Sequence, residues 1–119
     1  MSNDVSSIAV IGAGTMGSGI SLVAATSGID AFQVDVSADQ LDRARKYHDK
    51  VLSRNVEKGR MTEEEKVAAL GRITYCGDMA EAKTADWAVE AATENPDIKA
   101  KIFVAMKETF PSHAVLATN

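Results

Sequence analysis

The chain has 119 residues, of which 45% are hydrophobic and 25% charged, and its net charge is −4. This length suits one globular domain, and the composition excludes a disordered chain. The negative charge gives no reason to expect nucleic acid or an anionic membrane as a partner, because both recruit clustered positive charge. No apolar run approaches the roughly 20 residues of a membrane span, and no secretory signal opens the chain. The single cysteine, Cys76, fits a reduced, cytoplasmic setting.

The beginning of the chain predicts a strand, a helix and a second strand. "SIAVI" (7–11) is a short, continuous apolar run, which is typical of a strand buried in a parallel sheet. "TMGSGISLVAATSG" follows and predicts an amphipathic helix that Gly28 stops. Its apolar face carries Met16, Ile20, Val23 and Ala24. "DAFQVDV" (30–36) alternates as a strand does, so residues 8–35 form one βαβ unit.

The next segment predicts a helical hairpin, which a simple crossover between strands does not need. Ser37 or Asp39 can cap a helix that runs to about Lys58, where Gly59 can adopt the left-handed stop conformation. The apolar positions at helical spacing are Leu41, Ala44, His48, Val51, Leu52 and Val56. "TEEE" (62–65) is a capping box that starts a second helix. An insertion of this kind costs little closure entropy and usually has a function.

Three further strands and a helix complete an alternating pattern. The strands are expected in "RITYC" (72–76), "DWAVEAA" (86–92) and "AVLATN" (114–119). Asn95 caps the helix and Pro96 occupies its first position. The apolar stripe of this helix consists of Ile98, Ile102, Ala105, Met106 and Phe110. The pattern predicts a doubly wound, parallel α/β sheet, with the second strand outside the first and the fourth on its other side.

Three glycines follow the first strand in "IAVIGAGTMGSGI" (8–20). Gly12 allows a tight turn, Gly14 lets the backbone approach a pyrophosphate, and Gly17 lets the helix pack close to the strand. The start of the helix then offers amide groups and a partial positive charge to an anion. The GxGxxG spacing is a weak signal alone. Its place between a strand and a helix predicts a dinucleotide site.

Asp35 lies 18 residues after Gly17, at the end of the second strand. A carboxylate at this position can accept hydrogen bonds from an adenosine ribose and repels a 2′-phosphate, which predicts NAD rather than NADP. A helix cap and a solvated strand-end aspartate are the simpler alternatives for Asp35. A flavin or S-adenosylmethionine site remains open. Against these, flavoproteins more often carry glutamate at the ribose position, and methyltransferase loops more often run GxGxG.

Four segments resemble the N-terminal domain of the 3-hydroxyacyl-CoA dehydrogenases, the 3-hydroxybutyryl-CoA type included. They are "IAVIGAGTMGSGIS", "VEKGRMTEEEK", "DWAVEAATENPDIKAKIF" and "AVLATN", within about residues 7–119. The resemblance implies a Rossmann domain over residues 1–119 with the helical hairpin inserted between strands 2 and 3. It also implies NAD-dependent interconversion of 3-hydroxyacyl-CoA and 3-ketoacyl-CoA in fatty acid metabolism. The family's C-terminal helical domain, which forms most of a homodimer contact, is absent from these residues.

The resemblance also assigns residues to the site. The cofactor residues that it implies are Gly12, Gly14, Thr15, Met16, Gly17, Asp35, Ala91, Glu94 and Lys99. Glu94 and Lys99 match positions on the nicotinamide side, and Lys58 of the hairpin matches a coenzyme A contact. Val51 stands where the family often has a serine contact. The simpler alternatives are a first-turn acid for Glu94, a surface ion pair for Lys99 and a last-turn cation for Lys58.

The sequence supplies no general base that matches the family. Oxidising a secondary alcohol needs a base for the hydroxyl proton, and the family uses a histidine held by a glutamate. His48 falls on an apolar helix face and reads as a packed histidine, and His113 precedes the last strand. We therefore expect NAD binding without turnover, and assign neither a catalytic residue nor a metal site. A stand-alone NAD-binding module remains open. So does a 3-hydroxyisobutyrate or 6-phosphogluconate dehydrogenase, although these lack the charged hairpin.

Overall fold

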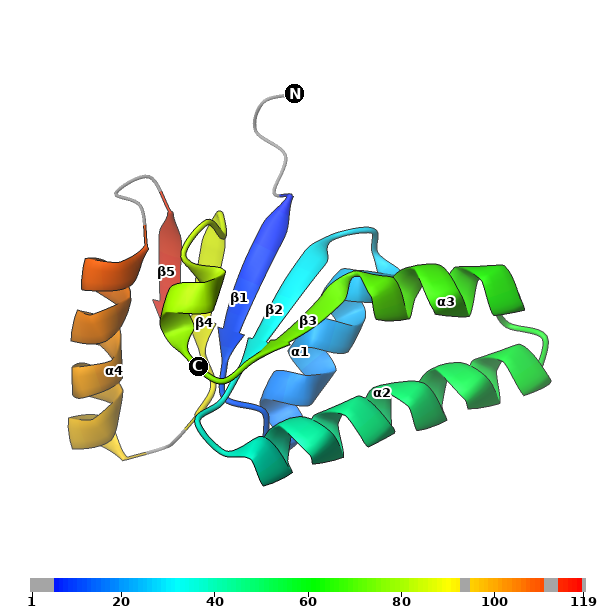
Figure 1. Ribbon diagram of the computed structural model, residues 1–119, viewed down its shortest axis with the longest axis horizontal. Helices are drawn as coiled ribbons and strands as arrows, with labels where there is room; N and C mark the ends of the chain where they lie inside the picture. Colours follow the sequence, from blue (N-terminus) through cyan, green and yellow to red (C-terminus); the bar gives the residue numbers. More distant parts are fainter. Residues whose placement is uncertain (1–5, 93–94, 111–113, 119) are drawn as a thin grey trace.

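The computed structural model describes residues 6–92, 95–110 and 114–118 and shows a parallel sheet with helices on both faces (Figure 1). Its elements are β1 (Ser7–Ile11), α1 (Thr15–Thr26), β2 (Asp30–Val34), α2 (Ala38–Glu57), α3 (Glu63–Gly71), β3 (Ile73–Cys76), a 3₁₀ turn (Met79–Ala82), β4 (Trp87–Glu90), α4 (Pro96–Thr109) and β5 (Val115–Thr118). The strand order is β3-β2-β1-β4-β5. This order confirms the predicted placement of the second and fourth strands. None of the helices within the described residues is long and apolar enough to cross a membrane.

The helix ends follow the capping chemistry of the sequence. Of the two candidates for the start of α2, Ser37 is the cap, because its hydroxyl accepts a backbone amide hydrogen bond. Gly59 has a φ of +72° and ends that helix. Thr62 and Glu65 form both hydrogen bonds of the predicted capping box, at 3.1 and 2.8 Å. Asn95 accepts two amide hydrogen bonds at the start of α4.

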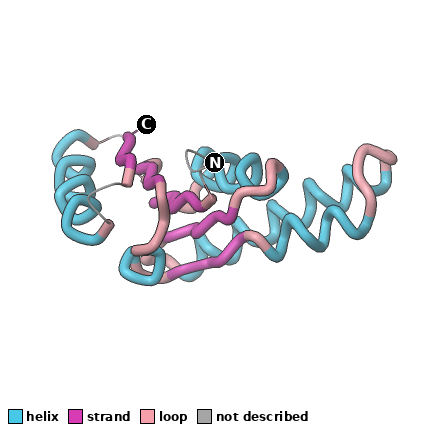
Figure 2. The backbone as a smooth tube through the Cα atoms, turned by 90° about the horizontal axis from the view of Figure 1, so that it is seen from above, coloured by secondary structure: helices cyan, strands magenta, loops and turns pink. Residues whose placement is uncertain are grey.

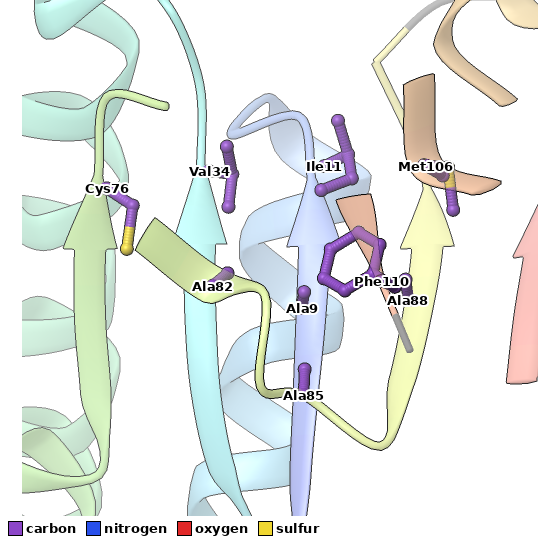
Figure 3. Close-up of a cluster of buried hydrophobic side chains, with 9 residues drawn as sticks. All are labelled: Ala9, Ile11, Val34, Cys76, Ala82, Ala85, Ala88, Met106 and Phe110. Atoms are coloured by element: carbon purple, nitrogen blue, oxygen red, sulfur yellow. The ribbon is translucent and has the colours of Figure 1, made fainter. Parts of the chain in front are cut away.

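Two apolar clusters lie on opposite faces of the sheet. The first, between the sheet and the 3₁₀ turn with α4, consists of Ala9, Ile11, Val34, Cys76, Ala82, Ala85, Ala88, Met106 and Phe110 (Figure 3). The second, toward α1, α2 and α3, consists of Leu22, Ala24, Ala25, Ala31, Leu52, Ala69 and Ile73. Because side chains alternate along a strand, Ala31 faces one cluster while Val34 faces the other. The sheet is therefore buried on both faces, as the continuous apolar runs predict.

The buried face of α1 differs from the prediction. Met16 and Val23 are 54% and 66% exposed, although the pattern placed both on the apolar face. The buried residues of α1 are instead Gly17, Ser18, Ser21, Leu22, Ala24 and Ala25. α1 packs against β2 and also against α2, so this face carries mostly small residues that allow a close approach. Ile98 of α4 is likewise 46% exposed, whereas Met106 near the C-terminal end of that helix and Phe110, its C-cap, are buried.

α2 and α3 form the predicted hairpin, which extends away from the sheet (Figures 1 and 2). α2 has 20 residues and is therefore about 30 Å long. Its N-terminal end follows β2 at the carboxyl edge of the sheet, and its C-terminal end lies at the tip of the hairpin. The Lys66 ammonium lies 3.6 Å from the Asp49 carboxylate and links the two helices. The tip of the hairpin therefore lies well away from the sheet.

Candidate functional site

The glycine loop has the geometry that its spacing predicts. Gly12 has a φ of +113°, and a Cβ there would lie 2.6 Å from the Cα of Ala92. A Cβ on Gly17 would lie 1.8 Å from the Gly12 carbonyl oxygen, so only glycine permits this packing of α1 on the loop. A Cβ on Gly14 would meet nothing within 4 Å, which leaves that side of the loop open. Gly14 is also the N-cap of α1 and makes no side-chain cap. A helix start of this kind suits an anion.

The loop lies at the carboxyl edge of the sheet, where the strand order reverses around β1. Open α/β sheets bind ligands in the crevice at such a point. A cavity of about 360 Å³ opens there, and its lining includes Gly12, Asp35, Val36, Met79, Ala92 and Ile102. Ala91 borders the loop, because its amide donates a 2.8 Å hydrogen bond to the carbonyl of Ile11. The volume is within the range of small-molecule sites.

Asp35 anchors the glycine loop to the end of β2. Its Oδ2 accepts a 2.9 Å hydrogen bond from the Ala13 amide, and its Oδ1 accepts one of 2.9 Å from the Ser37 amide. Asp35 is therefore not the helix cap, which is Ser37, and it is not merely a solvated aspartate. A carboxylate has about four acceptor positions, and these two bonds leave capacity for ribose hydroxyls. The side chain is half-buried beside the cavity.

Lys99 pairs with a buried acid that the sequence did not single out. Its ammonium donates a hydrogen bond to Oε1 of Glu90, whose side chain is 0% exposed. Oε2 of Glu90 accepts a 2.7 Å hydrogen bond from the Ala92 amide, directly beside Gly12. The pair therefore links α4 to the end of β4. The alternative suggested for Lys99 was a pair with an acid on the surface, whereas the Glu90 partner is fully buried. Glu94 lies outside the described residues.

Lys58 is separated from the other candidates. It caps the C-terminal end of α2 at the exposed tip of the hairpin, whereas the glycine loop faces the other end of that helix. A second cavity, of about 320 Å³, lies on the α2 side of the loop, and its lining includes Thr15, Ser18, Arg43 and Tyr47. The structure thus brings the glycines, Thr15, Met16, Asp35 and Ala91 to one edge and leaves Lys58 apart.

His48 is a packed histidine, as predicted. It is 0% exposed, its Nδ1 lies 2.7 Å from the Tyr75 hydroxyl, and its Nε2 lies 2.8 Å from the Ser18 carbonyl. Burial lowers the pKa of His48, and the hydrogen bond to Ser18 acts in the opposite direction. Burial also raises the pKa of Cys76, which fits the packing role expected of it. His113 lies outside the described residues.

Residues 7–119 match the family model described as "3-hydroxyacyl-CoA dehydrogenase, NAD binding domain". The chain belongs to this family. The cofactor of the 3-hydroxyacyl-CoA dehydrogenase NAD-binding domain is NAD, in agreement with the prediction from Asp35 and the glycines. The resemblance drawn from "VEAATEN" and the hairpin is likewise confirmed.

Named relatives of this NAD-binding domain agree with the family match. The chain is 36% identical over 116 residues to a probable 3-hydroxybutyryl-CoA dehydrogenase of Bacillus subtilis, a match that covers 98% of this chain and 40% of that protein. It is also 36% identical over 116 residues to 3-hydroxyadipyl-CoA dehydrogenase of Escherichia coli, with 98% and 24% covered. The chain thus spans less than half the length of these curated relatives.

Solved structures give the same fold. The crystal structure of 3-hydroxybutyryl-CoA dehydrogenase from Escherichia coli K12 is similar with a TM-score of 0.94 at 36% identity, covering 98% of this chain and 25% of that one. (S)-3-hydroxybutyryl-CoA dehydrogenase from Ralstonia eutropha is similar with a TM-score of 0.94 at 32% identity, covering 98% and 41%. The predicted Rossmann architecture is therefore confirmed.

The sequence analysis did not single out two buried polar side chains in the strands of this NAD-binding domain, Glu90 and Gln33. Glu90 stands in an otherwise apolar strand, and its 0% exposure shows that it needs an internal partner. Gln33 is also 0% exposed and lies in the middle of β2. A polar residue inside a buried apolar strand is itself a signal, because such a group must be hydrogen-bonded within the protein. That signal was available in "DAFQVDV" and "DWAVEAA".

Proposed function

We propose that this chain binds NAD across the carboxyl edge of its sheet. The residues proposed to contact the cofactor are Gly12, Gly14, Thr15, Met16, Gly17, Asp35, Ala91, Glu94 and Lys99. The observation that carries the proposal is the crowding of Gly12 and Gly17 beside the open Gly14, with Asp35 bonded to the same loop. The start of α1 would bind the pyrophosphate, and the Asp35 carboxylate would accept hydrogen bonds from the hydroxyls of the adenosine ribose.

We propose further that the domain serves an enzyme that interconverts 3-hydroxyacyl-CoA and 3-ketoacyl-CoA. The names of the relatives support this substrate class. When bound, NAD would accept the hydride from the carbon that bears the hydroxyl. Lys58, on the hairpin tip, would contact coenzyme A, and Lys99 would lie on the nicotinamide side, oriented by Glu90. A homodimer and a cytoplasmic setting complete the proposal, the latter supported by the single buried thiol.

We propose that the 119 residues alone bind NAD without turnover. General-base catalysis needs a group within hydrogen-bond reach of the substrate hydroxyl. The ring nitrogens of His48 are already engaged by Tyr75 and Ser18, and the ring is fully buried. This histidine therefore cannot take the role of the family's catalytic histidine.

The test is a calorimetric titration of the chain with NAD and with NADP, followed by an NADH oxidation assay with acetoacetyl-CoA. We expect saturable binding of NAD, weaker binding of NADP and no sustained NADH oxidation. Gly17→Ala should abolish NAD binding, because its Cβ would lie 1.8 Å from the Gly12 oxygen. Gly19→Ala is the matched control in the same helix, since a Cβ there meets nothing within 4 Å. Equal binding of NAD by both variants would contradict the proposed site.

A further inference from the structure

The first peptide of the glycine loop is held at both of its polar ends. The Gly12 carbonyl accepts a 2.7 Å hydrogen bond from Nε2 of Gln33, and the Ala13 amide donates a 2.9 Å bond to Asp35. Both partners come from β2 or the position directly after it. Because a peptide unit is planar, two bonds at its opposite ends fix the orientation of that plane. The direction in which the following amides of the loop point depends on this plane.

The Gly12 carbonyl also sets the position of α1. A Cβ on Gly17 would lie 1.8 Å from that oxygen, so the helix rests directly on it. Rotation of the Gly12 peptide would therefore move the carbonyl against the first turn of α1 or away from it. Gln33 is the side chain that holds this oxygen, and the same amide nitrogen lies 3.4 Å from the carbonyl of Val10.

The orientation of the Gln33 amide is itself determined by its neighbours. Two carbonyl oxygens face one end of the amide, so that end must be the donor nitrogen. Oε1 then faces Ser21, whose hydroxyl must donate its proton to it. The Ser21 oxygen is also 3.3 and 3.1 Å from the carbonyls of Gly17 and Ser18, which compete for the same single proton. A donor toward the Ser21 oxygen would favour the bond to Gln33.

His48 supplies that donor from α2. Its Nε2 lies 2.8 Å from the Ser18 carbonyl and 3.2 Å from the Ser21 oxygen. A carbonyl can only accept, so Nε2 carries a proton, and Nδ1 of the neutral ring accepts from the Tyr75 hydroxyl at 2.7 Å. Burial keeps the Tyr75 hydroxyl protonated, because it raises the pKa of Tyr75 to about 12 despite the nearby Arg45 guanidinium. The donors therefore run in one direction, from Tyr75 through His48, Ser21 and Gln33 to Gly12.

We propose that Gln33 is a positioning residue of the dinucleotide site and that Ser21, His48 and Tyr75 act on the site through it. These four residues, named here the β2–α2 hydrogen-bond chain, hold the Gly12 peptide in the orientation that receives the cofactor. The proposal rests on the proposed binding of NAD. Gln33, Ser21 and His48 are each 0% exposed, so solvent does not reach these hydrogen bonds in the folded protein.

A double-mutant cycle on the 119-residue chain tests the proposal. NAD dissociation constants are measured for the wild type, Gln33→Leu, Ser21→Ala and the double variant. Gln33→Leu should weaken NAD binding about tenfold and Ser21→Ala about fivefold, the size of one buried hydrogen bond. The double variant should match Gln33→Leu alone, because Ser21 acts through Gln33. A loss of NAD affinity of about 50-fold in the double variant would overturn the proposal, because the effects of independent substitutions on the binding free energy add.

Two further variants keep the test independent of overall stability. Ile73→Val shortens a buried side chain on β3 that is not part of the β2–α2 hydrogen-bond chain. It should lower the unfolding midpoint while leaving the NAD dissociation constant unchanged. Tyr75→Phe removes only the distal hydroxyl and should weaken NAD binding about twofold to threefold. If Gln33→Leu does not fold, Ser21→Ala and Tyr75→Phe decide the question. Wild-type affinity in both would overturn the proposal.

A measurement without NAD separates this inference from the proposed function. Hydrogen exchange of the Ala13 amide reports the orientation of the Gly12–Ala13 peptide directly. Ser21→Ala should accelerate it about tenfold relative to Ile73→Val at matched stability. Unchanged exchange would overturn the inference even if NAD binds. Faster exchange in a chain that does not bind NAD would instead overturn the proposed function and leave the positioning of the loop intact.

Discussion

At the scale of single residues, Asp35 combines two tasks in one carboxylate. It bonds the Ala13 and Ser37 amides, and its remaining acceptor capacity faces the cavity beside Val36. Asp35→Asn replaces one acceptor oxygen by a donor, so one of these amides loses its partner and the charge that repels a 2′-phosphate is gone. We predict that NAD affinity falls about tenfold and that the preference for NAD over NADP narrows. Isothermal titration with both cofactors measures the two effects.

The matched control for this prediction is Asp30→Asn. Asp30 lies exposed at the opposite end of β2, so its substitution should leave both affinities unchanged. An NAD-to-NADP ratio that stays the same in Asp35→Asn would contradict the ribose role. The backbone anchoring of the loop would then be the whole function of Asp35.

His48 is a second residue whose environment has a measurable consequence. Its pKa is lowered in the folded protein, chiefly by burial, whereas the unfolded chain has a histidine pKa near 6.5. Below about pH 6.5 the unfolded state therefore binds more protons, and the free energy of unfolding falls as the pH drops. We predict that His48→Gln, which keeps a donor toward the Ser18 carbonyl, removes this part of the acid sensitivity.

Urea unfolding of both proteins between pH 5 and pH 8 checks the prediction on His48. The difference in the free energy of unfolding between them should change as the pH falls below about 6.5 and stay constant above it. The Tyr75 hydroxyl, which faces the ring from β3, has its pKa raised to about 12 and so stays protonated throughout this range. A constant difference across the whole range would show that burial does not shift this histidine.

At the scale of elements, the sequence predicted where helices begin better than which helix face is buried. The caps at Ser37, Thr62 and Asn95 are local devices, so the nearby residues suffice to locate them. The buried face of α1 is set by what packs on it, and α2 returns to cover that helix from a distant part of the chain. Met16 and Val23 therefore lie exposed although their spacing is apolar. The pairing of Glu90 with Lys99 was hidden for the same reason, because it joins β4 to α4.

That pair gives a prediction about the attachment of α4 to the sheet. Lys99→Met removes the ammonium that bonds the buried carboxylate of Glu90, and removing one member of a buried pair costs about 3 kcal/mol. We predict a loss of this size in the free energy of unfolding, measured by urea titration. Lys101→Met on the exposed side of the same helix is the control and should change stability by less than about 0.5 kcal/mol. A Lys99 variant as stable as the control would show that the pair does not hold α4.

At the scale of the whole molecule, the places of β2 and β4 on either side of β1 were predicted from the alternating pattern. Alternating strands and helices with right-handed crossovers leave few arrangements, and the glycine loop marks the centre of the one observed. The site at that centre was only partly predictable. The positions of Gly12, Gly17 and Asp35 follow from local spacing. The cavity residues Met79 and Ile102 are brought there by the 3₁₀ turn and α4, whose packing no local pattern specifies.

Because the proposed cofactor contacts come from loops after β1, β2 and β4, NAD would stabilise the sheet as one unit. A ligand at 100 times its dissociation constant adds about 2.7 kcal/mol to the free energy of unfolding. For a chain of 119 residues, this corresponds to a rise of about 10 °C in the unfolding midpoint. We predict this rise in a single thermal transition followed by circular dichroism. Gly19→Ala should show the same rise and Gly17→Ala none, since only the latter closes the space beneath the Gly12 carbonyl. A rise in both variants would place NAD elsewhere on the molecule.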